Sequence, residues 1–173
     1  GYDDIIIGAV RKNSYQGAVY VIYGAPKSSL PNINLGSVTL NPATNGFMVT
    51  ESATSAFFGW QVSAAGDVNK DGFDDIIITS YKKNSEQGAA YVIYGGPRSS
   101  MATFDLSTSL ASTNRAFMIT ADASGDHFGY SVSSADINND GYSDIIIGAS
   151  QKNSKHGAVY VIHSGIVFLL PLL

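Results

Sequence analysis

The sequence contains no cysteine among its 173 residues. Disulfide bonds, thiolate metal sites and cysteine nucleophiles are therefore excluded. Charge is also sparse, because 10 Lys and Arg stand against 14 Asp and Glu, for a formal net charge of −4. This balance argues against nucleic-acid binding, which needs a basic surface. No run of 18 apolar residues is present, so we expect no membrane insertion by this segment.

Apolar residues, glycines and aromatics are plentiful. They include 45% hydrophobic residues, 18 Gly, 10 Tyr and 8 Phe. Such a composition favours folding over disorder. Many glycines beside many aromatic residues are typical of short strands joined by tight turns.

The chain is built from repeats. Three similar segments begin at Gly1, Gly72 and Gly141, and the second reads GFDDIIITSYKKNSEQGAAYVIYGGP. A further pair of segments, starting at Phe58 and Phe128, precedes the second and third copies. The first copy lacks this upstream half, so the sequence holds about two and a half units.

Each unit reads as four short strands and shows no sustained helical period. The expected strands are the segments 59–65, 74–79, 88–95 and 116–120, with their repeats at 129–135, 143–148, 157–164 and 46–50. We predict an all-β fold of four-stranded antiparallel β-propeller blades, forming an open arc of about 2.5 blades, because a ring needs four to eight. A solenoid is the alternative, although its repeats are usually shorter.

The predicted units are residues 1–26 (second half of a blade), 27–97 (a full blade), 98–165 (a full blade) and 166–173 (an apolar tail). The tail is interpreted as a last strand or a truncation artefact, and alternatively as the start of a lost transmembrane or sorting segment. An open arc predicts exposed blade faces, covered by the remaining blades or by self-association.

Two acidic loops join the first and second strands of the full units. Oxygen-bearing side chains occupy their positions 1, 3, 5 and 9, a Gly occupies position 6, and a backbone carbonyl is available at position 7. The candidate ligands are Asp67, Asn69, Asp71, Phe73 and Asp75 in one loop and Asp136, Asn138, Asp140, Tyr142 and Asp144 in the other. Asp4 matches position 9 of a partial third site.

The spacing of these oxygens predicts calcium sites. Ca²⁺ takes six to eight oxygen ligands in a flexible shell, whereas Mg²⁺ demands octahedral geometry and keeps its waters. Position 12 is Ile78 or Ile147, where an EF-hand needs Glu, so these are nine-residue hairpin loops. The alternative is a pair of metal-free Asx turns, in which clustered carboxylates would repel one another.

These motifs together resemble those of FG-GAP repeats. Phe58-Gly59 opens a unit, the D-x-N-x-D-G-x-x-D loop follows, and Tyr94-Gly95-Gly96-Pro97 closes it. FG-GAP repeats are the blades of the integrin α-subunit β-propeller. The resemblance implies calcium loops on one face and a protein or glycan ligand on the opposite face. The closing motif departs from the pattern at His163-Ser164-Gly165, so the resemblance does not establish that the blades close into a ring.

The face opposite the acidic loops is expected to be basic. The loops between the second and third strands hold six of the ten basic residues: Arg11, Lys12, Lys82, Lys83, Lys152 and Lys155. Loops on a rigid scaffold commonly carry recognition. The alternative is that Lys-Asn-Ser is a solvated turn kept by duplication.

No catalytic residues are assigned, because P-loop, GxSxG and HExxH motifs are missing. His127, His156 and His163 occupy different repeat positions, so they form no repeated cluster. We therefore expect a non-enzymatic, calcium-binding segment of an extracellular or cell-surface adhesion protein. The alternative is an accessory propeller of a larger secreted hydrolase, such as a phospholipase D-type enzyme.

Overall fold

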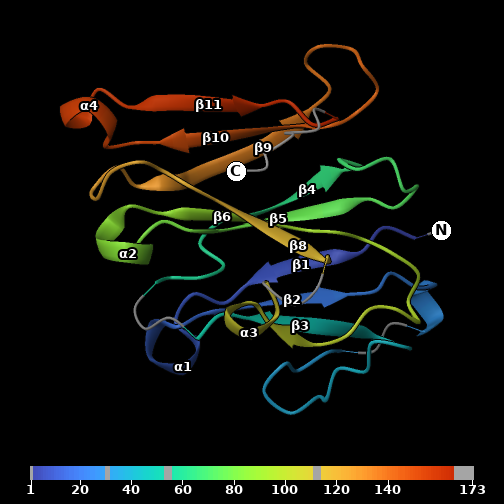
Figure 1. Cartoon of the computed structure of the whole chain (residues 1–173). Coiled ribbons are helices and arrows are strands. Elements are labelled where there is room, and N and C mark those ends of the chain that lie inside the picture. Colours follow the sequence, from blue (N-terminus) through green and yellow to red (C-terminus); the bar gives the residue numbers. More distant parts are fainter. Residues whose placement is uncertain (1, 30–31, 53–55, 111–113, 166–173) are drawn as a thin grey trace.

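The computed structural model describes residues 2–29, 32–52, 56–110 and 114–165. Three β-sheets lie side by side in chain order, as Figure 1 shows from blue through green to red. The predicted apolar tail, residues 166–173, lies outside the described residues. The all-β prediction is confirmed, and so is its division into sheets of the size of propeller blades.

The first sheet has the order β1-β2-β3-β7. Its antiparallel strands are β1 (Ile5–Gly8), β2 (Ala18–Ile22) and β3 (Gly46–Thr50). The fourth strand, β7 (Phe104–Asp105), pairs parallel with β3 and comes from the connection inside the next sheet. The sequence patterns gave no sign of this strand, which is two residues long and defined by its neighbour.

The second and third sheets are antiparallel throughout. The second has the order β4-β5-β6-β8, with β4 (Val62–Gly66), β5 (Asp75–Ser80), β6 (Ala89–Ile93) and β8 (Ala116–Thr120). The third contains β9 (Phe128–Ala135), β10 (Asp144–Ala149) and β11 (Ala158–Ile162). The predicted unit 27–97 therefore supplies β3 to the first sheet and β4, β5 and β6 to the second. The chain passes from one sheet to the next just before each Phe-Gly pair.

Helices are short and lie in connections. They are α1 (Lys12–Tyr15), the 3₁₀ turn η1 (Lys27–Ser29), α2 (Lys83–Glu86), α3 (Leu106–Ser109) and α4 (Lys152–Lys155). Within the described ranges, no helix is long and apolar enough to cross a membrane.

Alternating side chains on the strands build the two cores between sheets. On β6, Tyr91 and Ile93 pack toward the first sheet, whereas Ala90 and Val92 pack toward the third. This is the period-two pattern of a strand that is buried on both faces. On β11 the equivalents of Ala90 and Val92, Val159 and Val161, are 69% and 45% exposed. The outer face of the third sheet is therefore open, as expected for an arc.

Candidate metal centre

The first acidic loop folds around its own side chains. The Asp67 carboxylate accepts the backbone N–H groups of Asp71 (3.1 Å) and Gly72 (2.9 Å). Asn69 Oδ1 also accepts the N–H of Asp71 (3.0 Å), and Asp71 Oδ1 accepts that of Phe73 (2.9 Å). Because Asx side chains readily bind backbone groups a few residues ahead, the sequence itself favours this turn.

Asp75, at position 9, fastens the loop to the second sheet. Its side chain is fully buried, and its two oxygens accept the N–H groups of Val68 (3.0 Å) and Gly95 (2.8 Å). Burial raises the pKa of Asp75 to about 6; the two N–H groups lower the pKa in part, while the charges of Asp71 and Asp67 raise it further. The carboxylate thus joins the start of the loop to the end of β6.

The second loop repeats these contacts atom for atom. The Asp136 carboxylate accepts the N–H groups of positions 5 and 6, and the side chains at positions 3, 5 and 9 accept the same backbone groups as in the first loop. The contacts are Asp140 N to Asp136 Oδ1 (3.1 Å), Gly141 N to Asp136 Oδ2 (2.9 Å), Asp140 N to Asn138 Oδ1 (3.1 Å), Tyr142 N to Asp140 Oδ1 (2.8 Å), Ile137 N to Asp144 Oδ2 (3.0 Å) and Ser164 N to Asp144 Oδ1 (3.0 Å).

The buried carboxylate of the second loop has a different neighbour. His163 Nδ1 lies 3.1 Å from Asp144 Oδ2, whereas the equivalent residue beside Asp75 is Tyr94. Burial alone would raise the pKa of Asp144, but the close approach of His163 and the hydrogen bonds from the N–H groups of Ser164 and Ile137 together outweigh it and lower that pKa. The two loops therefore have the same backbone hydrogen-bonding pattern, but the pKa values of their buried carboxylates shift in opposite directions.

Asp4 occupies the place expected of a leftover ninth position. Its Oδ1 accepts the N–H of Gly24 (2.8 Å), as Asp75 accepts that of Gly95. The anchoring contact is thus present in all three sheets.

The donor set of each loop fits a hard cation. In the described part of the chain, no three carboxylate or histidine groups are gathered closely enough to form a ready metal cluster. The oxygens at positions 1, 3 and 5 nevertheless surround one turn, and Asn69 Nδ2 donates to Asp71 Oδ2 at 2.9 Å. A carboxylate oxygen that accepts one N–H keeps a second lone pair. The residues therefore fit Ca²⁺ by the chemistry of their oxygens.

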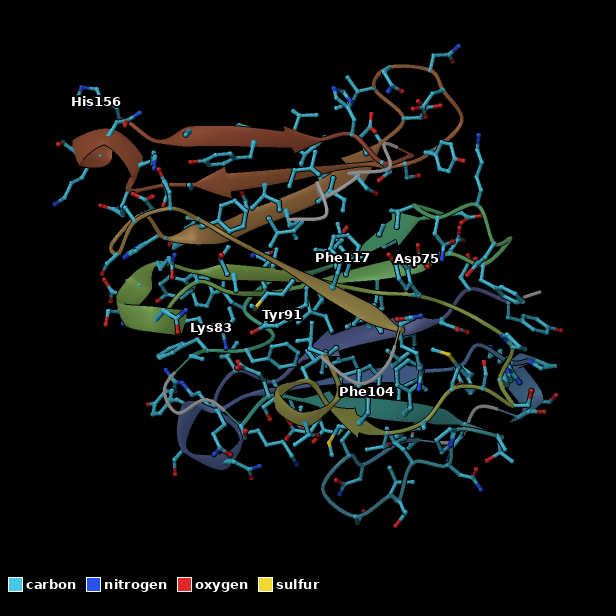
Figure 2. All side chains as sticks on the ribbon, viewed as in Figure 1. Asp75, Lys83, Tyr91, Phe104, Phe117 and His156 are labelled. Carbon is cyan, nitrogen blue, oxygen red and sulfur yellow. The ribbon has the colours of Figure 1, made fainter. Side chains whose placement is uncertain are left out.

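The lysine-bearing loops lie at the opposite end of the sheets from the acidic loops. Figure 2 shows Lys83 at the α2 end of the second sheet and Asp75 near the other end. In each lysine loop, three consecutive residues with side chains adopt positive φ; in α1 these are Asn13, Ser14 and Tyr15, at 49°, 56° and 68°. Three left-handed residues in a row are costly, and the sequence analysis missed them.

The glycine after each of the first two of these turns lies against the phenylalanine of a Phe-Gly motif. Gly17 bridges to Phe58 and Gly88 bridges to Phe128. A Cβ at either glycine would lie 2.0 Å from the phenylalanine carbonyl oxygen, and both glycines have a φ near 88°. Only glycine permits so close an approach between neighbouring sheets.

The lysine end is less basic than its residue count suggests. Lys83 pairs with Glu51, which is 3% exposed, and Lys152 pairs with both Asp122 and Asp126. Lys82 lies 3.3 Å from Glu86. The expectation of a basic face therefore needs correction, because Glu51, Asp122 and Asp126 come from loops distant in sequence and Glu86 from the same loop as Lys82.

An aromatic cluster also lies at this end. Its rings are in successive contact, with centroid separations from 4.7 Å (Trp60 to Tyr81) to 6.3 Å (His127 to Tyr130). The members are Tyr15, Phe57, Trp60, Tyr81, His127 and Tyr130. Tyr15 and Tyr130 are about two-fifths exposed, at 41% and 42%. No single motif marks this cluster, since its residues come from all three units.

Comparison with known proteins agrees with the geometry. The FG-GAP repeat model matches residues 58–93 and 128–162. These two segments are FG-GAP repeats. Each match runs from the Phe-Gly pair through an acidic loop to the third strand of a sheet, so the resemblance found in the sequence is confirmed.

The similar curated proteins are integrin α chains. Integrin alpha pat-2 of Caenorhabditis elegans is 31% identical over 175 residues, covering 94% of this chain and 13% of the relative. Integrin alpha-5 of Xenopus laevis is 29% identical, covering 92% and 15%. Integrin alpha-2 of Bos taurus is 34% identical over 96 residues, covering 55% and 8%. The matched part of the chain thus spans between 8% and 15% of the length of these relatives.

Proposed function

We propose that this chain is a non-catalytic, calcium-binding FG-GAP propeller segment of an adhesion or recognition protein at the cell surface or outside the cell. One observation carries the calcium assignment: two loops 69 residues apart hold the same oxygens in the same hydrogen-bonded frame. The integrin α relatives support the adhesion role and the extracellular location.

The proposed ligands are the oxygens already described. In the first loop they are the side chains of Asp67, Asn69, Asp71 and Asp75 with the carbonyl of Phe73; in the second they are those of Asp136, Asn138, Asp140 and Asp144 with the carbonyl of Tyr142. A bound calcium ion supplies positive charge without directional demands. The chain's own contribution is to keep the oxygens close through the backbone N–H groups, so that little conformational entropy is lost on binding.

Calcium would stiffen the acidic end of each sheet. Asp75 links its loop to Gly95 at the end of β6, and Asp144 links its loop to Ser164 after β11. Neutralising the clustered carboxylates removes their mutual repulsion, which otherwise opposes this arrangement. A stiff acidic end would hold the loops at the other end in register.

The ligand surface that we propose lies at the lysine end. The aromatic cluster there has Lys82 Nζ 5.0 Å from the Phe57 ring centre and the Arg11 guanidinium 6.0 Å from that of Tyr15. Partly exposed aromatic rings beside cations are typical of protein and glycan recognition surfaces. The surface lies on the face opposite the calcium loops, as the resemblance implies.

The open faces of the end sheets would receive further blades. On the first sheet Ile5 and Ile7 are 55% and 37% exposed, while their equivalents on β10, Ile145 and Ile147, are fully buried against the second sheet. We propose that additional blades, or another copy of the chain, cover these positions. The hydrolase alternative draws no support from the relatives named above.

Thermal unfolding with and without calcium tests the assignment. Sites of the extracellular type bind at roughly 10⁻⁴–10⁻³ M. One millimolar Ca²⁺ would then add about 1 kcal/mol per site, or about 4–8 °C in Tm for two sites. Asp71→Ala or Asp140→Ala should each abolish at least half of the shift, while the exposed Asp74→Asn serves as the control. An unchanged Tm of the parent chain in chelator and in calcium would refute the assignment.

A further inference from the structure

The two acidic loops are joined by a lysine that belongs to only one of them. Lys70, at position 4 of the first loop, donates from Nζ to the carbonyl oxygen of Asp140 in the second loop at 2.9 Å. The same ammonium lies 3.8 Å from the centre of the Tyr142 ring. It also passes over Gly141, where an added Cβ would lie 3.1 Å from Nζ. Lys70 therefore touches positions 5, 6 and 7 of its neighbour.

These three positions matter to the second loop. Asp140 supplies the side chain at position 5, Tyr142 supplies the carbonyl at position 7, and Gly141 makes the turn between them. A charge-assisted hydrogen bond to the outward carbonyl and a cation–π contact together hold this turn in place. Lys70 reaches it without supplying a ligand to either loop.

The direction of Lys70 depends on the first loop being folded. Its φ is 57°, a left-handed conformation that is sparsely populated outside turns. Asp67 and Asn69 hold that turn closed through the N–H of the next residue, Asp71. Binding of an ion by Asp67, Asn69 and Asp71 would stabilise the turn and keep Lys70 aimed at the second loop.

We propose that Lys70 couples the two calcium sites, so that filling the first loop raises the calcium affinity of the second. The inference rests on the proposed calcium binding and adds that the two sites bind calcium cooperatively. Coupling of this kind is reciprocal, so filling the second loop also strengthens the first. In the second loop the equivalent residue is Asn139, which has the same φ of 57°. Its short amide side chain carries no ammonium group that could make the same contacts.

The bases of the loops are packed together, which gives the coupling a rigid support. The Ser134 hydroxyl donates to the carbonyl oxygen of Ala64 at 3.1 Å, and the N–H of Ser143 lies 3.5 Å from the carbonyl oxygen of Asp67. Contacts between neighbouring repeats are the usual route of coupling in repeat proteins. Lys70 extends this contact from the strands to the metal-binding turns.

Simple electrostatics predicts the opposite sign. A lysine ammonium repels a nearby cation, so its removal by Lys70→Met would strengthen calcium binding in the second loop. The proposed coupling predicts that the same substitution weakens it. The direction of the change therefore separates a positioning role from a charge effect.

Calcium titration followed by ¹H–¹⁵N spectra gives a signal for each loop. The N–H groups of Gly72 and Gly141 donate to Asp67 and Asp136, so each reports on one turn. In Asp71→Ala, which silences the first loop, the calcium midpoint of Gly141 should rise by about threefold to tenfold. Lys70→Met should raise it by a similar factor, and the double variant should raise it no further.

Two further variants make the test specific. Lys70→Arg keeps a cation on a long stem and should preserve most of the coupling, while Lys155→Met, in a lysine loop, should leave both midpoints unchanged. A Gly141 midpoint that is unchanged or lowered in Lys70→Met would overturn the coupling while calcium binding stands. Titrations in which neither glycine responds in the parent chain would overturn the proposed function and the coupling with it.

Discussion

The two ends of the sheets handle their acidic residues in different ways. At the lysine end Glu51, Asp122 and Asp126 each lie against a lysine of a neighbouring loop, and Glu86 lies against Lys82 of its own loop. At the acidic end, within the described ranges, the side chains of Asp67, Asp71, Asp136 and Asp140 make hydrogen bonds but no ion pair. The carboxylates of the lysine end are therefore neutralised by the chain's own lysines. Those four carboxylates of the acidic end, in contrast, are available to an external cation.

The lysine end should show the largest response to a single substitution. Lys83→Met removes the partner of the buried Glu51 carboxylate and should lower the free energy of unfolding by about 3 kcal/mol, because an uncompensated buried charge remains. Lys82→Met breaks an exposed pair with Glu86 and a cation–π contact with Phe57, and should cost about 1 kcal/mol. Urea unfolding of both variants measures the difference. Equal losses would show that the two pairs are not distinguished by burial.

Asp75 tests the anchoring of the acidic end. Asp75→Ala leaves the buried N–H groups of Val68 and Gly95 without an acceptor and should lower the free energy of unfolding by about 2 kcal/mol in calcium-free buffer. The neighbouring, exposed Asp74→Ala should change it by less than about 0.5 kcal/mol. Urea unfolding in chelator makes the comparison. If both variants unfold alike, the buried carboxylate has no anchoring role.

The two buried carboxylates should respond oppositely to pH in calcium-free buffer. The pKa of Asp75 is raised to about 6, so the folded state holds its proton more firmly than the unfolded state, and this contribution to stability is lost as pH rises toward 6. The pKa of Asp144 is lowered, so its contribution is lost as pH falls below the ordinary Asp range. Carboxyl ¹³C titration should place the Asp75 midpoint near 6 and the Asp144 midpoint below the ordinary Asp value. Coinciding midpoints would contradict this difference.

The sequence was sufficient where structure follows from local pattern and duplication. Eight strands were predicted from alternating patterns and from short continuous apolar runs, and β4, β5, β6 and β8 confirm four of them in one sheet. The turns of the acidic loops follow from Asx side chains that bind nearby backbone N–H groups. Both features require only residues close in the chain.

Features that depend on a neighbouring sheet could not be read from the sequence. Strand β7 exists because Phe104 and Asp105 pair with β3, more than 50 residues away. The Lys83 to Glu51 pair and the aromatic contact of Trp60 with Tyr130 also join distant residues. The opposite pKa shifts of Asp75 and Asp144 arise from what packs against each carboxylate. The repeated sequence predicts the strands and turns that the units have in common. The contacts of each unit with its neighbours determine the features in which the units differ.

A crystal grown in millimolar calcium and measured for anomalous scattering shows whether the acidic loops bind the ion. Calcium binding requires one anomalous peak inside each acidic loop, within about 2.3–2.6 Å of the oxygens at positions 1, 3, 5, 7 and 9. Ordered loops without such peaks, with Asp67 and Asp136 still bound only to backbone N–H groups, would contradict it.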